Sequence, residues 1–268
     1  MNIEVLGNVQ DGGVPHLGCD CDTCTDARED PREQRYTASI VLREDSSPGT
    51  VTYLIAASPD IRYQVDVEYI DGVFVPHTGL GHVTGLLYFG EEGPDATDLN
   101  VYCNEYVQNF LRKNDPYRYL LDRGNIEIQD FSDGDAEELQ GGKIKALEHY
   151  HPQFNTETTS YLIEGEEKTL YYISDVTEFT DEIIETIKEA DIAILDGTFW
   201  SRDEIDRYEE VPHPAIKESM ELFDDVDTDI YFTHMNHTNP VLREDAEERQ
   251  EMEDRGFEIV EKGDEFEI

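Results

Sequence analysis

Histidine residues occur in this sequence of 268 residues directly after short apolar runs, where a strand would end. In the first such place, an apolar run at residues 72–75 stops at Pro76, and His77 and His82 follow on a glycine-containing stretch. This pattern predicts a buried strand, a tight loop and the first turn of a helix. Neutral imidazole is the commonest ligand for transition metals. Two histidines on one loop therefore favour a shared metal ion, and two loop histidines that face solvent are the alternative.

The same arrangement returns at later strand ends. Singly, an aspartate in such a place is usually a turn former, and a lone histidine is usually a surface residue. Six of the eight histidines lie at such ends, which favours one ring of ligands held on loops by a rigid sheet core. The ring predicted in this way consists of His77, His82, His149, His151, Asp175, Asp196, His234 and His237.

Three cysteines form a second group, because Cys19, Cys21 and Cys24 follow the spacing Cys-x-Cys-x-x-Cys. Thiolates are preferred soft ligands for zinc, and in a cytosolic chain such a cluster indicates a metal site and not a disulfide. A structural zinc ion takes four ligands. The candidates for the fourth ligand are His16, Cys103 and His213. We prefer His213, because it lies in a loop between two prolines that can reach another loop.

The charge balance is extreme, with 63 acidic against 20 basic residues and a net charge of -43. Such a surface repels itself in dilute buffer, whereas molar salt shortens the screening length to roughly 3 Å. The 15 tyrosines and 11 phenylalanines argue against an acidic disordered chain. We therefore expect a cytoplasmic protein of a halophile that does not bind nucleic acid. The sequence starts without the features of a signal peptide, and no apolar run approaches the ~18 residues of a membrane span.

Predicted strands and helices are mixed along the whole chain. Strands are expected at residues 3–7, 39–43, 50–55, 72–75, 99–103, 126–128, 143–147, 158–163, 169–173, 192–195 and 230–233, and residues 257–260 and 265–268 are expected to pair as a closing hairpin. Helices are expected at residues 61–67, 106–112, 181–189, 214–223 and 245–255, with Thr180 as the cap of the helix at 181–189. Since no linker interrupts the pattern, we predict one α/β domain over residues 1–268 in which helices cover the outside of two stacked sheets.

This pattern resembles the metallo-β-lactamase fold, a four-layer αββα sandwich whose loops carry one or two metals. Within it, the chain is similar to the B proteins of pyrroloquinoline quinone (PQQ) biosynthesis. The similarity lies in Ala-Ser-Pro-Asp-Ile-Arg at 57–62, His-Val-Thr-Gly-Leu-Leu at 82–87, Leu-Asp-Gly-Thr-Phe-Trp at 195–200, and the stretch 234–245. The cysteine cluster also resembles the PhnP-like phosphodiesterases. The resemblance covers most of the chain and implies a small-molecule or peptide-derived substrate.

The chain departs from the superfamily signature His-x-His-x-Asp-His. Laid on it, residues 77–82 place Gly79 at a ligand histidine and Gly81 at the acidic ligand. The PQQ-type proteins look to keep that aspartate. The resemblance therefore implies a depleted dinuclear site, in which Asp175 stands at the bridging carboxylate. The ligands that remain are His82, His149 or His151, Asp175 and His234, with His77 at the edge.

Three functions follow from these expectations. Zinc with an open coordination position would lower the pKa of a water molecule towards ~7, and Asp175 or Asp196 could take a proton or orient that water. Iron(II) on histidines and one carboxylate would suit oxygen chemistry instead, and manganese is a further candidate. The resemblance implies either oxidative tailoring of a Glu-Tyr intermediate or hydrolysis, such as of a phosphodiester or thioester. A binding protein with a decayed metal site is the third possibility.

Overall fold

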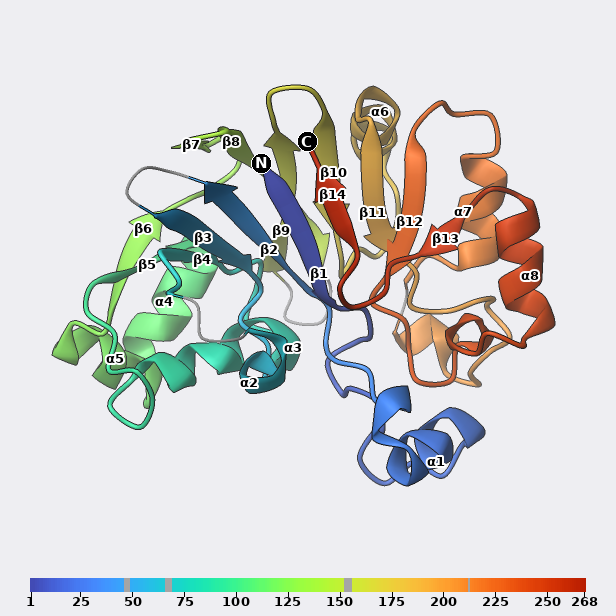
Figure 1. Ribbon diagram of the computed structural model, residues 1–268, viewed down its shortest axis with the longest axis horizontal. Helices are drawn as coiled ribbons and strands as arrows, with labels where there is room; N and C mark the ends of the chain where they lie inside the picture. The colour runs from blue at the N-terminus through green and yellow to red at the C-terminus, as the bar shows by residue number, and fades with distance from the viewer. Residues whose placement is uncertain (46–48, 66–68, 152–155, 212) are drawn as a thin grey trace.

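Two mixed β-sheets face each other and helices cover their outer sides (Figure 1). The computed structural model describes residues 1–45, 49–65, 69–151, 156–211 and 213–268. In this part of the chain, the first sheet has the order β14 (Glu265–Glu267), β1 (Asn2–Gly7), β2 (Ser39–Asp45), β3 (Thr50–Ile55), β4 (Gly72–Phe74), β5 (Leu99–Cys103), β6 (Ile126–Asp130). The second has the order β13 (Glu258–Ile259), β12 (Asp229–Thr233), β11 (Ile192–Asp196), β10 (Thr169–Ile173), β9 (Thr156–Glu164), β8 (Gly142–His151), β7 (Ala136–Leu139).

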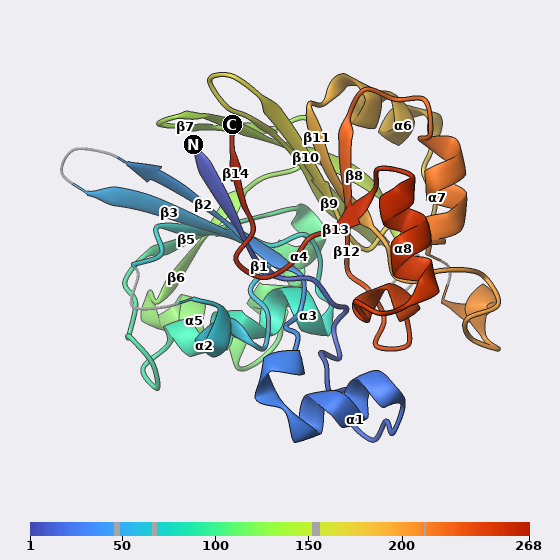
Figure 2. The same ribbon diagram turned by 45° about the vertical axis from the view of Figure 1, so that its right-hand side comes forward.

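The helices divide between the two sheets. Next to the first sheet lie α2 (Ile61–Gln64), α3 (Leu80–Val83), α4 (Glu105–Lys113) and α5 (Tyr117–Arg123), and next to the second lie α6 (Asp181–Glu189), α7 (Ile216–Leu222) and α8 (Glu247–Asp254). Helix α1 (Asp22–Glu29) lies apart, below the sandwich (Figure 2). Thr180 caps α6 by accepting a hydrogen bond from the backbone N–H of Ile183, at the expected place.

Three apolar clusters separate the four layers, which confirms the predicted αββα sandwich. Residues from both sheets, such as Phe74 and Tyr172, form the middle cluster. The outer clusters bury one face of each helical layer, for example Leu111 of α4 against the first sheet and Ile187 of α6 against the second. Burial of these side chains is the main favourable contribution to the fold.

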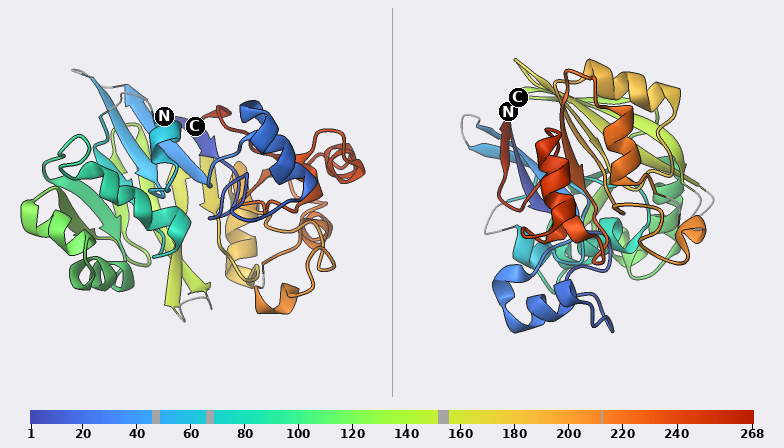
Figure 3. Two further views of the ribbon diagram at one scale, coloured as in Figure 1. Left: turned by 90° about the horizontal axis from the view of Figure 1, so that it is seen from below. Right: turned by 90° about the vertical axis from the view of Figure 1, so that its right-hand side faces the viewer.

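Strand direction gathers the functional loops at one edge of the sandwich. Strands β10, β11 and β12 run parallel, so that their carboxyl ends meet at that edge. Strand β8 shares their direction, because β8 and β10 are both antiparallel to β9. In the other sheet β1, β3 and β4 share one direction for the same reason. Figure 3 (left) views this edge from below, the side on which α1 lies.

The predicted closing hairpin is wrong. Strand β14 pairs antiparallel with β1, whereas β13 pairs parallel with β12 in the opposite sheet. Gly263, which has φ +96°, marks a crossover between the sheets, and its N–H donates to Val5 O (2.8 Å). Alternating apolar residues indicate a strand but not its partner.

Two further differences concern elements. The short patterns at α1, α5 and β7 did not predict these elements, which are short or contain few apolar residues. Residues 66 and 67 of the expected helix at 61–67, and residues 46–48 of the turn expected between the strands at 39–43 and 50–55, lie outside the described residues. None of the helices that the structure describes has the length and apolar character needed to cross a bilayer.

Candidate metal centre

Four side chains from four separate segments of the chain converge at the edge where the strands end. The group consists of Asp11, His82, Asp175 and His234, and one donor atom of each lies within 4.8 Å of the others. His82 Nε2 is 2.6 Å and His234 Nε2 is 3.0 Å from Asp175 Oδ2. Asp11 Oδ1 is 3.5 Å from His82 Nε2. Because zinc–ligand bonds of about 2.0–2.1 Å separate tetrahedral donors by roughly 3.3 Å, these four atoms fit around one ion.

The backbone at this edge adopts an uncommon conformation. Asp175 follows β10 with φ 55°, and His234 follows β12 with φ 62°. Residues with a Cβ atom seldom adopt this left-handed region, and such strain gathers at functional sites. Two residues of the group that contact each other, Asp175 and His234, therefore also carry local strain.

A second group uses the other side of the same carboxylate. It consists of His151, Asp175 and His213. His151 Nε2 lies 3.7 Å from Asp175 Oδ1, whereas Oδ2 faces the first group. His77 lies at the edge of the first group, with Nε2 4.0 Å from Asp175 Oδ2. Asp175 thus presents one oxygen to each group, at the bridging position that the resemblance implies.

Asp196 lies behind the histidines and is fully buried. Its Oδ2 is 2.9 Å from His213 Nδ1 and 3.6 Å from His234 Nδ1. The carboxylate also accepts a hydrogen bond from the backbone N–H of Thr198 (2.9 Å). Carboxylates that contact the far nitrogen of a ligand histidine orient the ring. This geometry favours a positioning role for Asp196 over the predicted role in proton transfer.

Burial and neighbouring charges set the protonation of the site. Burial lowers the pKa of His77 to about 3, so its ring stays neutral near pH 7. Burial alone would raise the pKa of Asp175, but the surrounding imidazoles, His234 foremost, hold it well below its usual range. Burial also opposes protonation of His213, yet Asp196 raises its pKa above the ordinary value. Burial opposes protonation of His234 as well, but its neighbours, Asp175 foremost, raise its pKa well above the ordinary value. Protons on His213 and His234 thus balance the buried carboxylates, and a cation that binds here takes the place of such protons.

Several donor atoms here are buried without a hydrogen-bond partner among the described residues. They include Asp11 Oδ1, His77 Nε2 and His234 Nε2. An unpaired buried polar group costs about 1–3 kcal/mol, and a cluster of three at one point is unusual in a native structure. A divalent cation held by the first group would satisfy Asp11 Oδ1 and His234 Nε2, so the residues fit the metal that the sequence predicts.

The cysteine cluster forms as predicted, but with a different fourth side chain. Cys19, Cys21, Cys24 and His237 bring four donor atoms within 4.8 Å of one another. His237 Nδ1 lies 3.4 Å from Cys19 Sγ and 3.6 Å from Cys21 Sγ. Cys103 is instead a buried core residue of β5.

The structure thus reverses the expected places of two histidines. His213, predicted for the cysteine cluster, lies beside Asp196, and His237, predicted for the ring, faces the cysteines. The reason is that the segment after β12 runs beside the segment after β1, where Val9 pairs with Met235. His237 is thereby carried to the N-terminal loop, where the cysteines lie.

Distance favours His151 over His149 as a ligand. Both residues point to one face near the end of β8, since side chains alternate along a strand. His151 contributes to the second group, whereas His149 belongs to none of the groups that the described residues form. Burial lowers the pKa of His149 to about 4, so its ring stays neutral near pH 7.

Asp11 was not among the predicted ligands, because an aspartate before two glycines is typical of a loop. Its position nevertheless indicated a possible ligand, since Asp11 follows the end of β1 as other candidate ligands follow their strands.

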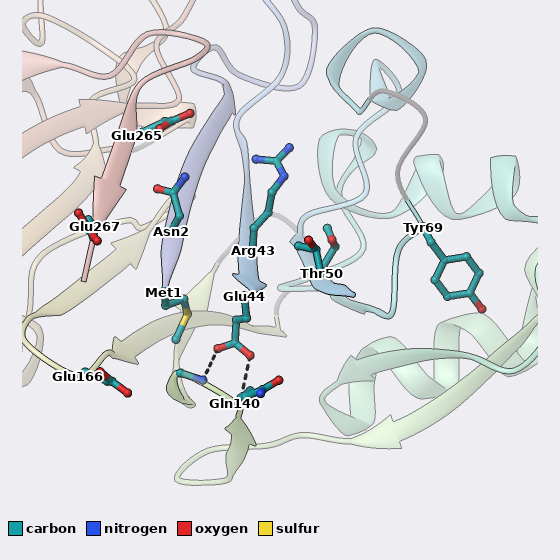
Figure 4. Close-up of a pocket in the computed structure, with 12 residues that line it drawn as sticks. Met1, Asn2, Arg43, Glu44, Thr50, Tyr69, Gln140, Glu166, Glu265 and Glu267 are labelled. Atoms are coloured by element: carbon teal, nitrogen blue, oxygen red, sulfur yellow. Dashed lines mark hydrogen bonds between the residues drawn. The ribbon is translucent and has the colours of Figure 1, made fainter. Parts of the chain in front are cut away.

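A separate pocket of about 970 Å³ opens at the opposite end of the strands (Figure 4). Met1 and Asn2 line it at the start of β1, and Glu44 accepts hydrogen bonds there from the backbone N–H groups of Gln140 (2.7 Å) and Gly141 (2.8 Å). No histidine or cysteine is found among its described lining residues. The described lining of this pocket therefore lacks the imidazole donors of the strand-end site.

Comparison with known proteins finds a matching family and relatives that cover nearly the whole chain. The model of the beta-lactamase superfamily domain matches residues 51–235. The coenzyme PQQ synthesis protein B of Acinetobacter baumannii (strain SDF) is 26% identical over 311 residues and covers 100% of both chains. The protein of the same name from Methylobacillus flagellatus (strain ATCC 51484 / DSM 6875 / VKM B-1610 / KT) is 27% identical over 307 residues, or 98% of each chain.

Two solved structures show the same fold. The Zn(2+)-bound PqqB from Methylobacterium extorquens has a TM-score of 0.86 at 23% identity, with 100% of both chains covered. A new diphosphatase from the PhnP family has a TM-score of 0.77 at 24% identity, with 100% of this chain and 96% of that chain covered. The family match spans more than half of the chain. The chain belongs to the β-lactamase superfamily.

Proposed function

We propose that this chain is a metal-dependent enzyme similar to the PQQ synthesis B proteins, acting on a small-molecule or peptide-derived substrate. One observation carries the proposal: Asp175 stands between two groups of imidazoles, with one oxygen towards each. A decayed site would be expected to lose such convergence, because buried unpaired donors are costly to keep. The cysteine cluster, whose thiols are free, supports the expected cytoplasmic location.

The residues have distinct roles in this proposal. His82, Asp175 and His234 hold one ion, and His151 and His213 face the other side of Asp175, where a second can bind. A metal bound there would supply a water molecule of lowered pKa, or a position for oxygen. The donor groups of this site are imidazoles and carboxylates, which suit zinc, iron or manganese.

Asp196 keeps the ligand rings in one orientation. Its Oδ2 lies near the Nδ1 atoms of His213 and His234, and Thr198 Oγ1 lies 3.0 Å from His234 Nδ1. With a proton held at Nδ1, the lone pair of His234 Nε2 is directed at the first group. The protein thereby selects the tautomer that binds a cation.

The cysteine cluster is proposed to hold a structural zinc ion. Three thiolates and one imidazole are a complete tetrahedral set, which leaves no position open for chemistry. Its ligands are Cys19, Cys21, Cys24 and His237.

A second candidate is hydrolysis of a phosphodiester or related bond. The similarity in fold to the PhnP-family diphosphatase supports it, and two metals that share one carboxylate suit an in-line displacement at phosphorus. The two candidates differ in what they turn over and not in which residues hold the metal.

The test measures metals and turnover together. The chain is purified in molar KCl, its metals are counted by mass spectrometry, and Asp175→Asn is the variant. We expect one zinc on the cysteines plus one or two site metals, and loss of the site metals and at least ~10³-fold of activity in the variant.

Two assays separate the candidates: hydrolysis of bis-p-nitrophenyl phosphate with zinc or manganese, and oxygen uptake with Fe(II) and a tyrosine-bearing peptide. Asp191→Asn serves as an acid-to-amide control outside the site. Only one metal per chain, lost with the cysteines, would support a binding protein with a decayed site.

A further inference from the structure

Asp11 occupies the space that two missing side chains would fill. A Cβ atom at position 81 would lie 2.2 Å from Asp11 Oδ1, a distance that real Cβ atoms do not reach. A Cβ atom at position 79 would lie 3.2 Å from Asp11 Oδ2 and 2.6 Å from His77 Nε2. Gly79 and Gly81 are thus the residues that let the Asp11 carboxylate and the His77 ring enter the site.

The Asp11 carboxylate has the surroundings of a ligand. Its Oδ1 is buried and has no hydrogen-bond partner among the described residues. It lies 3.5 Å from His82 Nε2 and 3.9 Å from His234 Nε2, and the latter atom is equally unpartnered. An anionic oxygen is not buried at such a point unless a cation or donor compensates it.

Backbone hydrogen bonds hold Asp11 beside His234. The N–H of Gln10 donates to Met235 O (3.0 Å), and the N–H of Met235 donates to Asn8 O (3.0 Å). The side chains of Gln10 and Asn236 are also hydrogen-bonded to each other. The residues adjacent to Asp11 and His234 therefore belong to one short ladder, which preorganises both donors.

We propose that Asp11 is a carboxylate ligand of the first metal, supplied by the loop after β1 in place of the acid absent at position 81. This inference rests on the proposed function. The resulting set has two imidazoles and two carboxylates, and the two carboxylates neutralise a divalent cation. The acidic ligand of the signature is therefore supplied by a loop distant in sequence, and Gly79 and Gly81 leave the space for it.

The experiment compares metal affinity of the intact chain with that of Asp11→Asn, by competition with a chelator for Mn(II) or Zn(II). We expect Asp11→Asn to weaken the non-cysteine metal at least tenfold while the cysteine-bound zinc stays at one per chain. Glu29→Gln, which removes one charge from the same N-terminal segment, should leave both affinities unchanged.

A second variant, in which the carboxylate is relocated, distinguishes the loss of a ligand from misfolding. Asp11→Gly combined with Gly81→Asp moves the carboxylate back to the position of the signature, and we expect it to bind the metal within about tenfold of the intact chain. Gly81→Asp alone should lower the melting temperature, because both carboxylates would need one space. Unchanged affinity in Asp11→Asn would overturn this assignment alone, whereas absence of any non-cysteine metal in the intact chain would overturn the proposed function as well.

Discussion

The two ligand groups of this protein are built in opposite ways. In the cysteine cluster, three of the four ligands lie within residues 19–24, and only His237 comes from elsewhere. In the histidine–carboxylate site, by contrast, each candidate ligand comes from a different segment, including helix α3 for His82 and strand β8 for His151. Thiolates at short spacing make a closed, local site, whereas buried imidazoles and carboxylates meet only when both sheets are formed. The first can stabilise a segment, and the second can report whether the whole fold is in place.

The two groups are nevertheless carried in part by the same two segments of the chain. The N-terminal loop carries both Asp11 and the cysteines, and the segment after β12 carries both His234 and His237. A metal on the cysteines would fasten these two segments to each other. We therefore infer that the local site holds part of the dispersed site in position.

The largest expected effect tests that connection with Cys21→Ser. Loss of a zinc ion present at 1,000 times its Kd removes about 4 kcal/mol of stability, or roughly 8–16 °C in melting temperature for a chain of this size. We also expect weaker metal binding at the histidine–carboxylate site. Metal counting and calorimetry measure both effects.

Cys103→Ala is the matched control for this variant, since Cys103 lies in the core and outside the cluster. It should keep both metals. If Cys21→Ser lost its zinc while the other site kept its affinity, the two groups would be independent and the inferred connection would be wrong.

The next effect should be confined to the histidine–carboxylate site. Asp196→Asn keeps the shape of the side chain but removes the charge that orients His213 and His234. We expect a 10- to 100-fold loss of metal affinity at pH 8, with the cysteine zinc retained. Equilibrium dialysis measures it.

The pH profile of Asp196→Asn separates positioning from a general loss of structure. Asp196 raises the pKa of His213 against the effect of burial, so its removal should lower that pKa. Protons then compete with the metal only at lower pH, so the apparent metal affinity should begin to fall from its high-pH plateau at a lower pH than in the intact chain. If this fall began at the same pH in both proteins, the assigned role would be contradicted.

The smallest effect concerns the segment that both groups share. Glu204 accepts hydrogen bonds from the Thr238 hydroxyl and the Trp200 backbone N–H, and burial raises its pKa from 4.5 to about 7. Between these values the folded state binds more protons than the unfolded state, so stability falls as the pH rises through this window. The full shift corresponds to about 3 kcal/mol, which partial exposure reduces to roughly 2 kcal/mol.

Glu204→Gln should remove this dependence. We expect urea unfolding at pH 8 to show a gain of roughly 2 kcal/mol over the intact chain, and little difference at pH 4. Both metal affinities should stay unchanged, because the amide oxygen can accept from the Trp200 N–H while the amide NH2 donates to the Thr238 hydroxyl. A change in metal affinity would show that this support acts on the sites directly.

Some features of the protein could be predicted from local patterns alone. Short stretches of sequence predicted the strands of the sandwich, the cap Thr180, the thiolate cluster and the placement of candidate ligands at strand ends. The reason is that the pattern of apolar residues and the spacing of cysteines can be read from neighbouring residues. The need for molar salt, expected from the charge balance, stays a prediction.

Other features were decided only by the tertiary structure. The exchange of His213 and His237, the separation of β13 from β14 and the entry of Asp11 beside Gly81 all depend on which loops lie side by side. The order and direction of strands decide this, and alternation within a strand carries no information about its partner. The residue types of the site were therefore determined by the sequence, and their assignment to one group or the other was determined by the packing of two sheets.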